Sequence, residues 1–116
     1  MDFDSAINAH VQWKTKLSNY LNKPDRSLNP AVVSSDQNCE LGKWLHGDGK
    51  KHSGLEGFST LVTEHTRFHK AAGEIIRKAD AGEKVSEEMA LGGTSDFSKT
   101  SAAVIRHLMQ LKMLIR

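Results

Sequence analysis

The sequence predicts an all-α fold, an antiparallel four-helix bundle with one additional short helix. Apolar residues recur at three- and four-residue steps over three long stretches, as they do on one face of an α-helix. A composition of 38% hydrophobic and only 6% aromatic residues favours packed helices over a sandwich of β-strands. With 116 residues the chain can enclose one core, so we expect a single domain over residues 1–116.

The first helix is expected over residues 3–22, with Asp2 or Asp4 as its N-cap. His10 lies in the middle of its apolar stripe, so its imidazole should face the interior. Two prolines and several small polar residues interrupt the periodicity after this helix. We therefore expect a linker loop over residues 23–37.

A short helix is predicted over residues 39–46, with Asn38 as its N-cap and with Gly47 and Gly49 ending it in the left-handed conformation. Cys39 would then occupy the first helical turn. The partial positive charge there favours a thiolate and lowers the pKa of the thiol. Because Cys39 is the only cysteine, no internal disulfide can form, and a reducing cytoplasm is the expected compartment.

The central helix is expected to run from Gly54 to Ala81 and to stop at Gly82. A polar loop over residues 47–52 precedes it, and residues 53–56 have the Ser-x-x-Glu pattern of a capping box. This helix carries the longest apolar stripe in the chain and sets the long axis of the domain.

The last helical segment should open at Ser86, and its apolar stripe resumes over residues 97–115. Gly92 and Gly93 interrupt it. Each glycine costs about 1 kcal/mol inside a helix relative to alanine, so we expect a kink or a break at this pair.

Two histidines, His65 and His69, lie four residues apart within the apolar stripe of the central helix. Residues at this spacing share one helix face, with Cβ atoms roughly 5–6 Å apart, which allows two imidazoles to bind one metal ion. The alternative is a pair of core histidines bonded to backbone carbonyls or water. The pair by itself leaves both interpretations open.

Adding the other inward-facing donors gives one sulfur and three nitrogens, from His10, Cys39, His65 and His69. Zinc favours such a four-coordinate set. The remaining histidines are expected to be solvated or to lie outside the ligand set: His46, His52 and His107. Trp13 and Trp44 are candidates for the apolar surroundings of the site.

Charge and hydropathy exclude two classes of partner. Sixteen basic and fourteen acidic residues are interspersed and give a net charge of +2, so nucleic acid is not an expected partner. No apolar run approaches the roughly 18 residues of a membrane helix, and no apolar segment follows Met1. We therefore expect a soluble, unprocessed protein that does not bind a membrane.

Three segments together resemble the chemoreceptor zinc-binding domain family in order and spacing. They are His10-Val11-Gln12-Trp13, the C-x-L-G-x-W motif that begins at Cys39, and the stretch from His65 to Ala72. The histidine motifs are common by themselves, and the cysteine motif between them makes the combination specific. The resemblance covers nearly the whole chain.

The resemblance implies an antiparallel helical bundle, often a homodimer, with one zinc held by three histidines and a cysteine. The matching positions are His10, Cys39, His65 and His69. Family members are cytoplasmic bacterial domains attached to chemoreceptors or diguanylate cyclases, and zinc binding or cysteine oxidation alters their output. This sequence contains no receptor or cyclase segment, so it is either a stand-alone member or an excised domain, and its output partner is open.

These observations predict a regulatory domain and not an enzyme, because four protein ligands leave no open position for a reacting water. Cys39 is the expected redox-sensitive residue. Two alternatives stay open. A hemerythrin-like di-iron bundle that binds oxygen would need bridging carboxylates turned to the core, and a structural zinc bundle would use the metal only for stability. Apolar faces beside Val11 and Met109 could support a homodimer.

Overall fold

The computed structural model describes residues 2–25, 27–83 and 90–115, and within these ranges it is helical, without strands. The all-α prediction is confirmed. Three helices are long: α1 (Phe3–Asn22), α4 (Phe58–Asp80) and α6 (Asp96–Ile115). Between α1 and α4 lie four short elements: α2 (Pro30–Ser34), the 3₁₀ turn η1 (Asp36–Asn38), α3 (Glu40–His46) and the 3₁₀ turn η2 (Asp48–His52).

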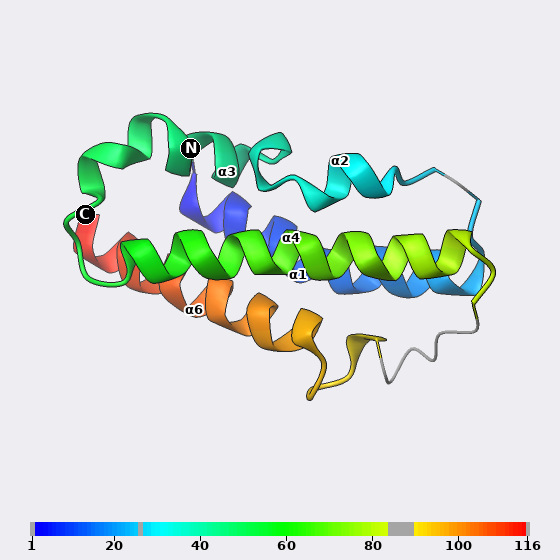
Figure 1. Cartoon of the computed structure of the whole chain (residues 1–116). Helices are drawn as coiled ribbons and strands as arrows, with labels where there is room; N and C mark the ends of the chain where they lie inside the picture. The colour runs from blue at the N-terminus through cyan, green and yellow to red at the C-terminus, as the bar shows by residue number, and fades with distance from the viewer. Residues whose placement is uncertain (1, 26, 84–89, 116) are drawn as a thin grey trace.

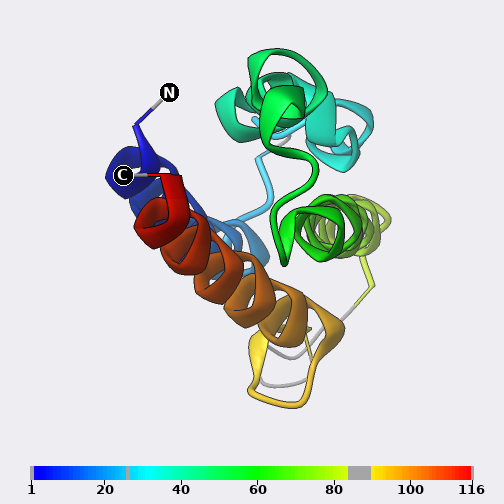
Figure 2. The same ribbon diagram turned by 90° about the vertical axis from the view of Figure 1, so that its left-hand side faces the viewer.

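The three long helices and the run of short elements from α2 to η2 pack side by side (Figures 1 and 2). The helices α1 and α4 run in one direction, whereas the short elements and α6 run in the other (Figure 1). The result is an antiparallel four-helix bundle of 44 × 24 × 20 Å. The run of short elements takes the place of its second helix (Figure 1). Both chain ends lie at the same end of the bundle as α3 (Figure 1).

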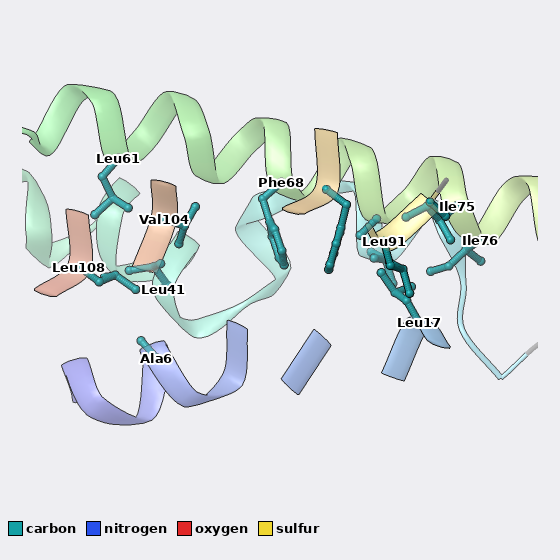
Figure 3. Close-up of a cluster of buried hydrophobic side chains, with 14 of the residues drawn as sticks. Ala6, Leu17, Leu41, Leu61, Phe68, Ile75, Ile76, Leu91, Val104 and Leu108 are labelled. Carbon is teal, nitrogen blue, oxygen red and sulfur yellow. The ribbon is translucent and has the colours of Figure 1, made fainter. Parts of the chain in front are cut away.

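The core follows α4 along its length (Figure 3). Leu61, Phe68 and Ile76 are fully buried on its inner face, and each contributes roughly 1.5–3 kcal/mol through burial of its side chain. Leu41 of α3 lies near Leu61 at one end of this core (Figure 3). The short elements between α1 and α4 therefore contribute to the core and also position Cys39.

Hydrogen bonds fix both ends of the bundle. Asp2 is the N-cap of α1, its side chain accepting a hydrogen bond from the backbone N–H of Asp4. Lys112 of α6 donates to Asp4 at 2.6 Å, which joins the end of α6 to the start of α1. At the opposite end, the hydroxyl of Tyr20 donates to Asp80.

The linker loop predicted over residues 23–37 is wrong in its second half, where α2 and η1 form. The side chain of Asn29 caps α2 by accepting from the N–H of Ala31 at 2.9 Å, and Pro30 occupies the first helical position, where its missing N–H costs nothing. Pro30 therefore begins a helix instead of interrupting one. Gly73 lets α2 approach α4, since a Cβ there would lie 1.8 Å from Ser34 Oγ.

The capping box predicted over residues 53–56 does not form. The helix α4 begins at Phe58, and Gly57 is its N-cap with φ 87°, without a side-chain cap hydrogen bond. The predicted left-handed ending at Gly47 is also wrong, because its φ is −119°. Gly82, with φ 79°, does stop α4 as expected.

The break predicted at Gly92 and Gly93 is confirmed: residues 90–91 are helical, a turn follows, and α6 begins at Asp96. Ser95 caps α6 by accepting a hydrogen bond from the N–H of Ser98. The predicted helix start at Ser86 lies outside the described residues. No helix in the described part of the chain is both long and apolar enough to span a membrane.

Candidate metal centre

Four side chains predicted as metal ligands meet between α1, α3 and α4. His10 comes from α1, Cys39 immediately precedes α3, and His65 and His69 come from α4. One donor atom from each lies within 4.8 Å of the donor atoms of the other three. The three histidines are buried, and Cys39 is partly buried. The structure therefore brings together the four residues that the sequence singles out.

Cys39 is itself the N-cap of α3, and the prediction of Asn38 at this position is wrong. The Sγ atom of Cys39 accepts a hydrogen bond from the backbone N–H of Gly42 at 3.3 Å. Gly42 is required here because a Cβ would lie 1.6 Å from the backbone oxygen of Asp36. The small size of Gly42 allows η1 to pack closely against α3. In this arrangement the thiol of Cys39 faces α4.

Backbone carbonyls fix the tautomers of two histidines. Nδ1 of His10 lies 2.7 Å from the carbonyl oxygen of Ala6, and Nδ1 of His69 lies 2.8 Å from that of Val33. A carbonyl can only accept, so both Nδ1 atoms carry the hydrogen, and in the neutral ring Nε2 is then a bare lone pair. Nε2 of His10 is buried without a hydrogen-bond partner.

His65 lies between two other donors of the cluster. Its Nε2 lies 3.0 Å from Nε2 of His69 and 3.2 Å from Sγ of Cys39. A neutral His65 carries a single N–H, so it cannot satisfy the lone pairs of both His10 and His69. Converging lone pairs in a buried site are unfavourable without a cation, and this favours a metal site over the alternative of core histidines.

Two distances within the cluster are close to those of a tetrahedral site. Zinc bonds of about 2.0–2.1 Å to nitrogen and 2.3 Å to sulfur place neighbouring nitrogens roughly 3.3 Å apart, and nitrogen and sulfur roughly 3.6 Å apart. The two distances at His65 are 3.0 and 3.2 Å, a few tenths of an ångström below these values, and all four donor atoms lie within 4.8 Å of one another. The four residues can hold a metal ion.

Burial dominates the proton affinities of the cluster. It lowers the pKa of His10 and His69, and it lowers that of His65 to about 3, with the neighbouring histidines adding to the shift. All three rings are therefore neutral at pH 7, the form that binds metals. Because the rings are neutral, they do not repel a cation.

The predicted lowering of the pKa of Cys39 is wrong for the metal-free chain. Burial raises the pKa of this thiol, although the N–H groups of Gly42 and Leu41 act in the opposite direction. The partial charge at a helix start is a small effect beside the removal of a thiolate from water. A bound cation would reverse the shift, because coordinating thiols are deprotonated.

Among the residues that the structure describes, no carboxylate belongs to the donor cluster. Glu64 pairs with Arg67 and Glu74 with Arg77 on the outer side of α4. The nearest carboxylate, Asp36, lies 4.0 Å from Nδ1 of His65, on the side of the ring away from the cluster. A di-iron centre needs bridging carboxylates, so this arrangement disfavours the hemerythrin-like alternative.

An aromatic ring packs against two histidines of the site. Phe68 packs against His10 and His69 with ring centroids 5.2 and 5.4 Å apart. Trp44 instead contacts Phe3, His52 and Phe58, and Lys16 lies over the ring of Trp13. The roles of Trp13 and Trp44 beside the site stay predictions.

The other three histidines lie outside the cluster, as expected. His46 bonds to Asp36 at 2.9 Å, and His52 stacks on Trp44. His107 lies near Gly57 at the start of α4, where its Nδ1 is buried without a partner.

Sequence reasoning missed the groups that orient two of the histidines: the carbonyls of Ala6 and Val33. Ala6 stands four residues before His10, so helix geometry could have identified it. Val33 is 36 residues from His69, and no local pattern indicates that contact.

Comparison with protein families settles what kind of domain this is. The family model of the chemoreceptor zinc-binding domain matches residues 10–76. The chain belongs to this family. The match begins at His10 and includes the other three residues of the cluster. No curated protein and no solved structure matches the chain.

The family description bears on the kind of metal that the site is suited to hold. The geometry alone indicates a four-coordinate ion bound by one sulfur and three nitrogens. The family name specifies zinc. The donor set and the family therefore agree.

Proposed function

We propose that this chain is a regulatory zinc-binding sensory domain of bacterial signalling, acting on chemotaxis or cyclic-di-GMP control. It responds to zinc, to oxidation of Cys39, or to both. The observation that carries the proposal is the convergence of bare Nε2 lone pairs from His10 and His69 on a site that contains His65 and the thiol of Cys39. Family membership supports it.

His10, Cys39, His65 and His69 would hold the ion, and when bound it would supply a tetrahedral link that fixes α3 to α1 and α4. Four protein donors leave no open position for a substrate water. A regulatory role without catalysis is therefore the favoured one.

Cys39 is the residue through which the state of the site changes. Its thiolate can attack an oxygen of hydrogen peroxide, forming an S–O bond while the O–O bond breaks; the products are a sulfenic acid and hydroxide, which takes up a proton to become water. Hypochlorous acid would oxidise the same sulfur. A sulfenic acid is a poorer metal ligand than a thiolate, so oxidation would release α3 from α1 and α4.

We further propose a homodimer formed through α1 and α6. Val11 on α1 and Met109 on α6 are each 51% exposed. The Asp4–Lys112 bond places the two helices side by side in antiparallel register, so Ile7 lies level with Met109. An apolar strip along two adjacent helices is suited to a second copy of the chain.

The proposed setting is the cytoplasm, where reducing conditions keep a lone thiol available as a ligand. The proposed output partner is a chemoreceptor or diguanylate cyclase segment, with no nucleic acid or membrane involved. The family description, which refers to chemoreceptors, supports the first of these partners.

The test is metal content by elemental analysis of protein purified without chelator. We expect one zinc per chain, and a clear loss of occupancy in Cys39→Ala. His52→Ala is the matched control, because His52 lies outside the cluster and should leave the zinc content unchanged. Absence of zinc, or iron in its place, would refute the ligand assignment.

The structural-zinc alternative needs a second measurement. A sensor domain must keep a folded state when zinc is removed, whereas a domain whose zinc site is purely structural need not keep one. Far-UV circular dichroism of the chelated protein separates the two: retained helicity supports the sensor, and general unfolding supports the structural role.

A further inference from the structure

Asp36 lies between a histidine of the metal centre and a histidine at the protein surface. Its Oδ2 atom is 2.9 Å from Nε2 of His46 and 4.0 Å from Nδ1 of His65. The Thr66 hydroxyl also points towards this oxygen, at 3.4 Å. The side chain of His65 is 0% exposed, that of Asp36 15% and that of His46 37%. The three side chains therefore form a path from the site to solvent.

His65 differs from the other two cluster histidines in its outer nitrogen. Nδ1 of His10 and of His69 each donate to a backbone carbonyl, whereas Nδ1 of His65 is buried without a hydrogen-bond partner. Histidines that bind a metal almost always donate their second N–H to a carboxylate, a carbonyl or a water. The carboxylate of Asp36 faces the one ring that lacks such a partner.

The proton of His65 must change position when this residue becomes a ligand. In the structure Nε2 of His65 contacts Nε2 of His69 and Sγ of Cys39. The Nδ1-protonated tautomer of His69 offers a lone pair there, so the single proton of His65 is best used on Nε2. Coordination through Nε2 requires that nitrogen to be bare. The proton then belongs on Nδ1, which faces Asp36.

We propose that Asp36 is the positioning residue of His65, accepting a hydrogen bond from its Nδ1–H when Nε2 binds the metal. This inference rests on the zinc-binding function proposed above. The separation of 4.0 Å must shorten by about 1 Å to reach hydrogen-bond length. His46, which donates to the same oxygen, holds the carboxylate in place from the end of α3, so occupancy of the site is coupled to that end of the helix.

Zinc affinity is the first measurement, by competition with a chromophoric chelator. We expect Asp36→Ala to weaken binding 10- to 100-fold, and Asp36→Asn to weaken it less, because the amide oxygen still accepts but carries no charge. His46→Ala should also weaken binding, through loss of the contact that holds Asp36. Asp48→Asn, at an exposed carboxylate in η2, is the control and should bind as the wild type does.

Nitrogen-15 NMR of the histidine rings gives a readout that a merely structural role would not move. We expect His65 to carry its proton on Nε2 in the chelated protein and on Nδ1 in the zinc-bound protein. The Nδ1–H should exchange slowly with water in the wild type and quickly in Asp36→Ala. If Asp36→Ala does not fold, Asp36→Asn and His46→Ala provide the same comparison.

The outcomes separate this inference from the proposed function. A wild type that binds one zinc, with Asp36→Ala and Asp36→Asn binding within twofold of it, overturns the role of Asp36 and leaves the zinc function intact. An unchanged His65 tautomer on zinc binding overturns it too. A wild type that binds no zinc overturns both proposals.

Discussion

Acidification from pH 7 to pH 5 is expected to destabilise the metal-free chain by about 2 kcal/mol through His65 alone. Burial and the neighbouring histidines lower the pKa of His65 from 6.5 to about 3 in the folded chain. The unfolded chain therefore takes up a proton near pH 6.5, whereas the folded chain takes it up only near pH 3. Because the unfolded state binds more protons across this window, the free energy of unfolding falls as the pH falls.

The magnitude follows from the unfolded state. At pH 5 almost all unfolded chains carry a proton on this ring, and the corresponding free energy is about 2 kcal/mol, compared with a few tenths at pH 7. Burial also lowers the pKa of His10 and His69, so their contributions have the same sign. The pKa of Asp36 is lowered as well, but an aspartate titrates below this window.

The assay is urea unfolding followed by circular dichroism at pH 7, 6 and 5 with excess chelator. The slope of the free energy against urea should stay constant while the midpoint falls. His65→Leu removes the titrating ring and should lose much of the pH dependence. An unfolding free energy that is equal at pH 7 and pH 5, or higher at pH 5, would refute the assignment of a buried neutral His65.

Two further predictions concern packing and assembly. Gly42→Ala should cost 1–3 kcal/mol or more, about the usual penalty for overpacking, and should weaken zinc binding, because the new Cβ meets the backbone of Asp36. Gly54→Ala meets nothing within 4 Å and should be neutral in the same thermal and chelator titrations. Met109→Lys should convert a dimer into a monomer in light scattering, whereas Val32→Lys on α2 should not; a monomeric wild type would contradict the proposed dimer.

Helix existence and the identity of the clustered donors could be predicted from sequence because both depend on short-range periodicity. The first helix has the predicted bounds, residues 3–22. His65 and His69 share a face of α4 through their spacing alone. The place of His10 beside them follows from its apolar stripe, whereas that of Cys39 rests on its position at a helix start and on the family resemblance.

The details of the site depended on competition between effects that sequence does not rank. Cys39, and not Asn38, caps α3, because the thiol accepts the N–H of Gly42 within a contact that η1 enforces. The same thiol has a raised pKa, because burial outweighs the helix start. Both errors have one cause: a local propensity of about 1 kcal/mol is overridden by packing between segments.

The short elements between α1 and α4 are the part of the bundle on which the proposed change at Cys39 would act. The helices α2 and α3 have five and seven residues, too few to be stable in isolation, so they depend on contacts with the long helices. Leu41 and Leu45 anchor α3 in the core, and Cys39 anchors its start at the metal centre. Under the proposed redox response, the long helices would keep their own buried stripes when the sulfur is oxidised, whereas α3 would lose the anchor at its N-cap. Segments with few buried contacts open at the lowest free energy, so the proposed change at Cys39 would act on the part of the bundle that can move without unfolding the rest.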